Sequence, residues 1–270
     1  AKLGAAPRPI GLVPTMGWLH DGHRSLVRRS RAECATTVLT IFVNPRQFGS
    51  PDDLARYPRN EARDLAICAD EGVDLVFAPP VDEVYPPGFD TVVSVGAIAR
   101  PLEGAARPGH FDGVATVVAI LLGLVGAERA YFGEKDAQQL LVIARMAADL
   151  ALPTAIVPCP TVREPDGLAL SSRNARLDGA ARDAAPVLHR ALRAGVALAA
   201  AGERDAERIR AAVRGVVAAE PAVRLEYASC ADPATLAELV TLPPGGGPAL
   251  LSLAAEVGGV RLIDNERLPG

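Results

Sequence analysis

The chain has 270 residues, 49% of them hydrophobic, and carries a formal net charge of −4 with an isoelectric point near 5.7. This length allows one or two domains with a sizeable core, and the acidic balance argues against a broad nucleic-acid or membrane surface. The longest apolar run, Val114 to Val125, is interrupted and too short to span a bilayer, and no export leader is recognisable, so we expect a cytoplasmic protein.

Strand and helix patterns alternate along residues 1–162. Apolar, β-branched runs predict strands at 10–13, 36–43, 75–78, 91–95, 129–132 and 155–158. Apolar residues at three- and four-residue spacing predict helices at 24–33, 61–71, 113–125 and 137–150. This alternation predicts an α/β fold, a Rossmann-like doubly wound parallel sheet whose ligands bind at the carboxyl ends of the strands. His20, Asn44 and Gly133 each follow a predicted strand and should share that edge.

The composition changes near residue 163. Two Ala- and Arg-rich helices are predicted at 178–201 and 205–219, followed by strands at 223–229, 249–255 and 260–264 around a turn at 243–248. Helices first and strands later predict a smaller α+β domain at 163–270, after an α/β domain at 1–162.

Some polar residue types are scarce in this chain. Lys2 and Lys135 are the only lysines among 28 basic residues, and Gln47, Gln138 and Gln139 are the only glutamines. Scarce residues that cluster mark positions where substitution is poorly tolerated. The four cysteines have neither the spacing of a metal site nor that of a disulfide framework, which favours reduced thiols.

The first candidate site is His20-Asp21-Gly22-His23, directly after the first predicted strand. A strand that turns into a helix directs free backbone N–H groups and the positive end of the helix dipole at one point, which suits phosphate. Two histidines three residues apart can reach the same anion, and Gly22 lets it approach the backbone. The alternative is a turn with two solvated histidines.

The second candidate is the stretch 41–48, where a buried strand ends in Asn44-Pro45-Arg46-Gln47. Neutral amides at a strand end suit recognition of hydroxyl and carboxylate groups. The alternative is a turn capped by Asn44 with Gln47 merely exposed.

The third candidate is the stretch 131–139, where a strand turns into a helix through Gly133. Lys135 is expected near the helix N-terminus, where a phosphate would bind, and Gln139 four residues further on along the same face. The alternative is an exposed lysine paired with Asp136.

The fourth candidate is the stretch 161–174, where a Pro-Asp-Gly turn precedes Ser171-Ser172-Arg173-Asn174. Two hydroxyls and a guanidinium could cradle a phosphate. Walker, Gly-x-Gly-x-x-Gly, Gly-x-Ser-x-Gly and metalloprotease motifs are missing from the sequence, which argues against kinase, dehydrogenase, hydrolase and zincin functions.

Six blocks in this order resemble the pantothenate synthetase (pantoate–beta-alanine ligase) family of the HIGH-motif nucleotidyl-transferase superfamily. The blocks are Pro-Thr-Met-Gly-x-Leu-His-x-Gly-His at 14–23, Ile-Phe-Val-Asn-Pro-x-Gln-Phe at 41–48, Tyr-Pro-Arg at 57–59, His-Phe-x-Gly-Val at 110–114, Phe-Gly-Glu-Lys-Asp at 132–136, and Asp-Gly-Leu-Ala-Leu-Ser-Ser-Arg-Asn at 166–174. The resemblance covers the chain from Gly11 to about Asn265.

The resemblance implies an ATP-dependent ligation in two steps. The carboxylate of pantoate attacks the α-phosphate of ATP to give pantoyl adenylate and pyrophosphate, and the amine of β-alanine then displaces AMP to give pantothenate. Magnesium would be carried on the ATP phosphates, with no metal site in the protein itself. The resemblance also implies a homodimer. Because acyl adenylates hydrolyse readily, we expect the second domain to close over the site as a lid that excludes water.

The resemblance also implies roles for individual residues. The expected catalytic residues are His20, His23, Lys135 and Arg173. They would supply cations and hydrogen-bond donors to the reacting phosphates, and His23 is the expected proton donor. The nucleotide would contact Met16, Gly17, Trp18, Leu19, His20, Asp21, Gly22, His23, Gly133, Glu134, Lys135, Asp136, Val162, Leu170, Ser171, Ser172 and Arg173. Gln47 and Gln139 would hold pantoate, with Gln47 also contacting β-alanine, and Asn44, Tyr57 and Asp64 would lie near the same cleft.

The chain departs from the family pattern at Trp18, where a smaller residue is usual, and at Ala137, where an aromatic is usual, and a short N-terminal segment is expected to be missing. Other functions that these motifs allow are a cytidylyl- or adenylyltransferase that stops after nucleotide transfer, a noncatalytic nucleotide-binding regulator, and a tRNA-binding synthetase fragment. The second acid pocket formed by Gln47 and Gln139 argues for a ligase, and the acidic charge argues against tRNA.

Overall fold

The computed structural model describes residues 3–243 and 248–268. The chain divides into two compact units, Ala1–Thr161 and Val162–Gly270. None of the helices in these described ranges combines the length and apolar character that a membrane span requires.

The first unit contains a five-stranded sheet in the order β3-β2-β1-β4-β5, in which all neighbours are parallel. The strands are β1 (Ile10–Thr15), β2 (Thr36–Ile41), β3 (Leu75–Phe77), β4 (Arg129–Gly133) and β5 (Ala155–Cys159). Because the strand order reverses between β1 and β4, their carboxyl ends form the switch point where α/β proteins bind ligands. This is the expected doubly wound fold.

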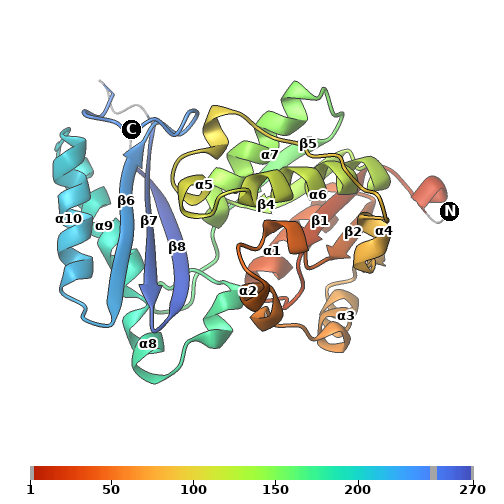
Figure 1. The fold of residues 1–270 in the computed structure, drawn as a ribbon, viewed down its shortest axis with the longest axis horizontal. Coiled ribbons are helices and arrows are strands. Elements are labelled where there is room, and N and C mark those ends of the chain that lie inside the picture. The colour runs from red at the N-terminus through yellow and green to blue at the C-terminus, as the bar shows by residue number, and fades with distance from the viewer. Residues whose placement is uncertain (1–2, 244–247, 269–270) are drawn as a thin grey trace. The chain divides into compact units, whose positions relative to one another are not determined.

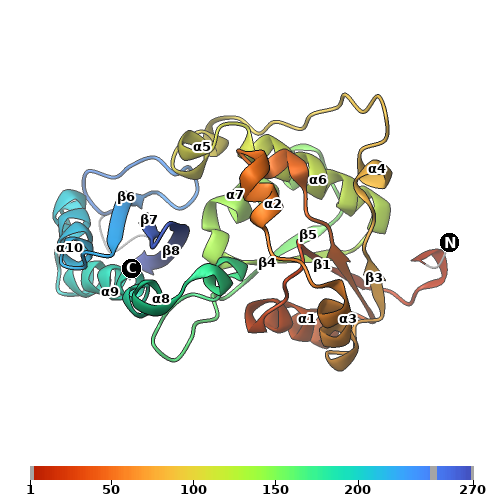
Figure 2. The same ribbon diagram turned by 60° about the horizontal axis from the view of Figure 1, so that its bottom comes forward.

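Helices cover both faces of this sheet (Figures 1 and 2). On one face lie α1 (Asp21–Glu33) and α3 (Glu61–Asp70), and on the other lie α6 (His110–Val125) and α7 (Ala137–Asp149). Shorter elements are α2 (Pro51–Arg56), α4 (Val81–Val84), α5 (Glu103–Ala106) and the 3-10 turns η1 (Leu3–Ala5), η2 (Pro45–Gln47), η3 (Ala97–Ala99) and η4 (Glu134–Asp136). The four long helices were expected, whereas α2, α4 and α5 were not.

The strand expected at Thr91–Val95 does not form. The segment has strong β propensity, but its residues lie mostly at the surface, outside every sheet of the described chain. The N–H of Val93 instead donates to Thr116 Oγ1 at 2.9 Å. Propensity alone therefore does not make a strand where no neighbouring strand offers a ladder of hydrogen bonds.

The second unit contains an antiparallel sheet of β6 (Val223–Ala231), β7 (Ala249–Val257) and β8 (Val260–Leu268). Its helices are α8 (Gly179–Ala184), α9 (Val187–Ala200) and α10 (Ala206–Ala218), and the turn η5 covers Ser172–Arg176. In Figure 1, α9 and α10 lie side by side along the sheet, and Leu192, Ile209 and Leu251 are fully buried in their common core.

The predicted helix at 178–201 is two helices, α8 and α9. Pro186 separates them because its ring nitrogen cannot donate the hydrogen bond that a continuous helix needs at that position. The strands predicted in this unit form and extend beyond the expected ends. The turn expected at 243–248 falls largely outside the described residues.

Gly11→Ala should destabilise the first unit. A Cβ at Gly11 would lie 2.2 Å from Ser30 Oγ, 3.0 Å from Cys34 Sγ and 3.1 Å from a ring carbon of Tyr131. Because Gly11 lies in the central strand, β1, we expect the free energy of unfolding to fall by about 1–3 kcal/mol, measured by urea denaturation.

The matched control is Gly123→Ala, at an exposed site within α6 where a Cβ meets nothing within 4 Å. This change should leave the stability equal or raise it by up to about 1 kcal/mol, because alanine favours the helix. Equal denaturation midpoints for the two variants would show that the contacts around Gly11 can relax without cost.

Candidate active site

The loop between β1 and α1 has a left-handed backbone. The φ angles of Gly17 and Trp18 are +78° and +50°. A Cβ on Gly17 would lie 2.9 Å from Asp64 Oδ2 and 3.1 Å from Ile41 Cγ2. Both the backbone angle and the space therefore require glycine at position 17.

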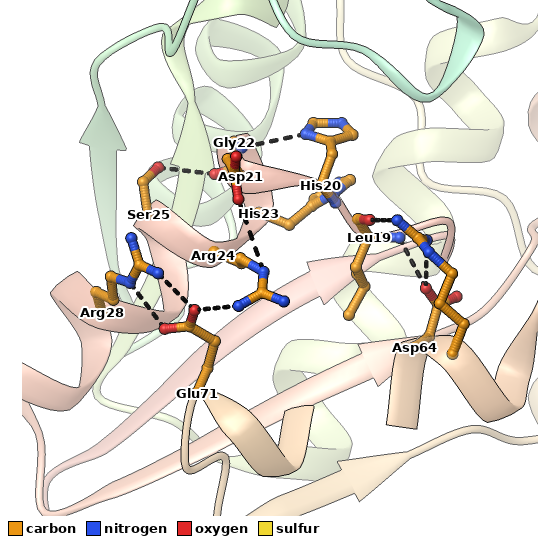
Figure 3. A network of polar contacts seen from close by, with 11 residues as sticks. Leu19, His20, Asp21, Gly22, His23, Arg24, Ser25, Arg28, Asp64 and Glu71 are labelled. Atoms are coloured by element: carbon orange, nitrogen blue, oxygen red, sulfur yellow. Dashed lines mark hydrogen bonds and ion pairs between the residues drawn. The ribbon is translucent and has the colours of Figure 1, made fainter. Parts of the chain in front are cut away.

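The carboxylate of Asp64 holds this loop in place. Asp64 is only 1% exposed, and its two oxygens accept the N–H groups of Trp18 at 2.7 Å and Leu19 at 2.8 Å (Figure 3). Hydrogen bonds from backbone N–H groups to a buried carboxylate are among the stronger ones in proteins. Asp64 thus fixes the backbone that leads into the two histidines.

His20 and His23 lie together at the start of α1 (Figure 3). His20 is the N-cap rather than part of the first turn: its Nδ1 accepts the N–H of Gly22 at 3.2 Å, while His23 Nδ1 accepts the N–H of His20 at 3.3 Å. The ring centroids are 4.0 Å apart. Since both Nδ1 atoms accept, each neutral ring carries its proton on Nε2, which is left to donate to a ligand.

The surroundings of both imidazoles favour the neutral form. Burial, and then the positive charge of Lys135, lower the pKa of His20 from 6.5 to about 4. Burial, and then the neighbouring His20 and Lys135, hold the pKa of His23 well below its usual value. At neutral pH these histidines are therefore hydrogen-bond donors rather than the cations that the sequence also allowed.

Lys135 lies in η4, between β4 and α7, with its side chain 15% exposed. Its charge acts on both imidazoles, so the structure brings together the three groups that the sequence placed at this sheet edge. The ion pair with Asp136 that was the alternative also exists, but Nζ and Oδ1 are 3.8 Å apart. A side chain with 15% of its surface exposed is not that of a solvated surface lysine.

Asn44 and Gln47 lie in one hydrogen-bond network after β2. Asn44 caps η2 and is 1% exposed, and its Nδ2 donates to Gln47 Oε1 at 2.9 Å and to the carbonyl of Gly113 at 3.0 Å. Its Oδ1 accepts from Tyr85 and from the N–H of Arg46. Asn44 is thus engaged within the protein, where it orients the half-buried Gln47.

A second set of contacts holds the backbone of Gln47. The Gln47 carbonyl accepts from Arg107 at 3.0 Å and from His110 Nδ1 at 2.8 Å, and Arg107 also lies 3.2 Å from His110 Nε2. A Cβ at Gly113 would come within 2.3 Å of the Arg46 carbonyl, so glycine is needed for α6 to approach η2. Arg107 was not singled out from the sequence, although His110 and Gly113 belong to one of the quoted blocks.

Gln138 and Gln139 have different surroundings. Gln138 is 6% exposed, donates to the carbonyls of Ile98 and Pro101, and accepts the N–H of Glu103. Gln139 is half-buried, and its amide makes no hydrogen bond within the described part of the chain. Of the pair, only Gln139 offers an amide to a ligand.

In the second unit, the expected turn forms between Arg163 and Ala169. Gly167 has φ +95°, and Leu170 N–H donates to the Val162 carbonyl at 2.9 Å. Arg163 anchors this hairpin through Asp264, at 2.7 Å, and Glu266, at 2.9 Å. Ser171 then caps η5, which contains Ser172 and Arg173.

The remaining expected site residues have clear positions in the first unit. Met16 is half-buried in the loop before α1, Asp21 and Gly22 begin α1, Gly133 ends β4, and Glu134 and Asp136 flank Lys135 in η4. Tyr57 is the C-cap of α2, and its ring packs edge-to-face with that of Phe48. Within the described residues, no group of three or more His, Cys, Asp or Glu side chains is arranged to hold a metal.

The doubly wound sheet and the neutral histidines beside a lysine define an α/β protein whose candidate site is suited to an anion. A family model described as pantoate-beta-alanine ligase matches residues 2–267. The pantothenate synthetase of Roseiflexus sp. (strain RS-1) is 61% identical over 255 residues, which are 94% of this chain and 91% of that protein.

Solved structures agree with this match. Pantothenate synthetase from Thermus thermophilus has a TM-score of 0.93 and 50% identity, covering 98% of this chain and 95% of the other. Pantoate-beta-alanine ligase from Francisella tularensis, complexed with beta-gamma ATP and beta-alanine, has a TM-score of 0.77 and 35% identity, covering 95% and 88%. The chain belongs to the pantoate-beta-alanine ligase family.

The pH dependence of the free energy of unfolding should show that His20 is neutral in the folded protein. Between about pH 6.5 and pH 4 the unfolded chain binds a proton at this residue and the folded chain does not, so the free energy of unfolding should fall as the pH falls through this window. For one such histidine the slope is at most about 1.4 kcal/mol per pH unit.

His20→Asn is the matched variant because asparagine still caps the helix but does not titrate. Urea denaturation at pH 7, 6 and 5 should give a shallower decline for His20→Asn than for the unmodified chain. Parallel declines would mean that His20 is protonated in the folded protein.

Proposed function

We propose that this protein condenses pantoate with β-alanine at the expense of ATP. In the first step a pantoate carboxylate oxygen bonds to the α-phosphorus of ATP, and the bond to pyrophosphate breaks. In the second step the β-alanine nitrogen bonds to the acyl carbon of the pantoyl adenylate, AMP leaves, and the nitrogen loses a proton. Membership of the ligase family supports the overall reaction.

The observation that carries the proposal is the meeting of His20, His23 and Lys135 at the carboxyl ends of β1 and β4. Attack at the α-phosphorus increases negative charge on its oxygens and on the departing pyrophosphate. Donors and a cation that are already in position stabilise that charge without reorganisation. The two Nε2–H groups and the Lys135 ammonium are such groups. His23, which the resemblance implies as the proton donor, is neutral here, so we propose that it acts by donating a hydrogen bond.

Gln47 and Gln139 are the proposed pantoate ligands, and Gln47 also contacts β-alanine. Gln47 is held from both its amide and its carbonyl, which favours a fixed orientation toward substrate. We assign Asn44 a positioning role through Gln47, and Tyr57 a place near the same substrates.

The nucleotide is proposed to contact the loop from Met16 to His23 and the turn from Gly133 to Asp136. Val162 and the stretch Leu170–Arg173 belong to the same proposal, with residues 163–270 acting as a lid that excludes water from the labile adenylate. Magnesium carried by ATP would add positive charge at the phosphates. The carboxylates of Asp21 and Asp136 act electrostatically on His20, and carboxylate oxygens are ligands that magnesium prefers.

The family resemblance also supports a homodimer in the cytoplasm, with small-molecule substrates and no nucleic-acid or membrane partner. The four cysteines are free thiols and three of them are buried, in keeping with a reducing compartment.

Product analysis tests this function. The protein mixed with ATP, magnesium, pantoate and β-alanine should yield pantothenate, AMP and pyrophosphate, and AMP release should depend on β-alanine. Lys135→Ala should lower the rate of adenylation by at least about 10- to 100-fold with the fold retained, because one charged phosphate contact contributes roughly 1.5–3 kcal/mol. Release of pyrophosphate with pantoate, but no AMP release when β-alanine is added, would instead indicate a simple nucleotidyl transferase, and full activity of Lys135→Ala would remove the lysine from the mechanism.

Gln139→Ala and Gln138→Ala should have opposite signatures. The Gln139 change should weaken pantoate binding in calorimetry while ATP affinity and the denaturation midpoint stay unchanged. The Gln138 change removes the hydrogen bonds from the Glu103 N–H and to the Ile98 and Pro101 carbonyls, of which the Pro101 carbonyl keeps the N–H of Gly104, so it should lower the free energy of unfolding by about 1–3 kcal/mol. Lost stability in the Gln139 variant, or unchanged pantoate affinity, would contradict the assignment.

A further inference from the structure

Arg63 is a cation of the candidate active site that the catalytic assignment above does not use. It comes from the first turn of α3, one residue before Asp64, and its guanidinium lies over the Trp18 ring, 5.0 Å from the centroid. Its Nη2 donates to the Leu19 carbonyl at 2.9 Å, and its Nη1 is 3.5 Å from Asp64 Oδ1. This guanidinium is therefore held by two contacts with the loop that precedes the histidines and by a third, longer contact with Asp64 of α3.

Several features suit Arg63 to a ligand. Its side chain is 42% exposed, so the group is held on one side and open to solvent on the other. A guanidinium has five N–H donors in a planar fork, and the contacts to Leu19 and Asp64 engage only part of that set within the described residues. The positive charge of Arg63 lowers the pKa of His20, as the charge of Lys135 does.

A surface arginine paired with one carboxylate is the ordinary alternative. That pair is weak here, because Asp64 directs its two oxygens to the backbone N–H groups of Trp18 and Leu19 at shorter distances. Asp64 is buried while Arg63 is not. The carboxylate therefore binds mainly the loop backbone, and the guanidinium can still bind another anion.

We propose that Arg63 is a further phosphate-binding residue, which the Trp18 ring and the Leu19 carbonyl hold in place to contact the triphosphate chain of ATP. The inference rests on the proposed function for the presence of ATP. It predicts that Arg63 contributes to binding of the phosphates and not of the adenosine.

Trp18 supplies a direct readout because it is the only tryptophan in the chain. Its ring contacts the Arg63 guanidinium, so a phosphate that bonds to this group should change the tryptophan emission. Binding can thus be followed without pantoate and hence without turnover.

The experiment is a titration of the unmodified chain, Arg63→Ala and Arg63→Lys with ATP and, separately, with adenosine, followed by Trp18 emission and calorimetry. Arg63→Ala should weaken ATP binding by about 10- to 100-fold and change adenosine affinity less than about twofold. Arg63→Lys should recover part of the ATP affinity, since it keeps the charge but loses the fork. The control is Arg28→Ala, which removes an equal charge from α1, where Arg28 pairs with Glu71 (Figure 3), and should leave both affinities unchanged.

Equal weakening of ATP and adenosine would show that Arg63 only supports the loop, and unchanged ATP affinity would show that it does not meet the phosphates. Either result overturns the inference while the proposed function stands. Failure of the unmodified chain to bind ATP would overturn the proposed function itself.

Discussion

The candidate active site depends on the two hydrogen bonds from the Trp18 and Leu19 N–H groups to the buried carboxylate of Asp64. Only five residues join β1 to α1, and two of them have left-handed backbone angles, one of them a tryptophan. A bulky residue in that region is costly unless its surroundings hold it there. By binding both N–H groups, Asp64 compensates the strain and sets the position from which α1, and with it both histidines, begins.

The start of α1 in turn determines the chemistry of the imidazoles. Two backbone N–H groups bind the two Nδ1 atoms, and burial beside Lys135 opposes protonation. The Nε2–H donors are thus available without two further charges that would repel Lys135. In such a site the fixed positive charge comes from lysine and arginine, and the neutral imidazoles contribute directional hydrogen bonds.

The sequence predicts what depends on local pattern, and misses what depends on distant contacts. Apolar runs located the five strands of the parallel sheet, and Gly17 and the His-x-Gly-His spacing located the turn into α1. Thr91–Val95 has the pattern of a strand and lacks a partner, which no local property reveals. The hydrogen bond from the Leu19 N–H to Asp64 joins residues 45 apart in the chain, and the cation–π contact of Arg63 with Trp18 is equally non-local, so no local pattern predicts either.

Gln138 and Gln139 show how such contacts distinguish a residue that supports the fold from one that is free to bind a ligand. Neighbouring residues on a helix point about 100° apart, so Gln138 enters the core while Gln139 stays at its edge. Gln138 satisfies three backbone groups of the segment from Ile98 to Glu103, which also leads to Arg107 and His110, the residues that hold the Gln47 carbonyl. A structural glutamine thus fixes the segment that positions one proposed pantoate ligand, next to the glutamine proposed as the other.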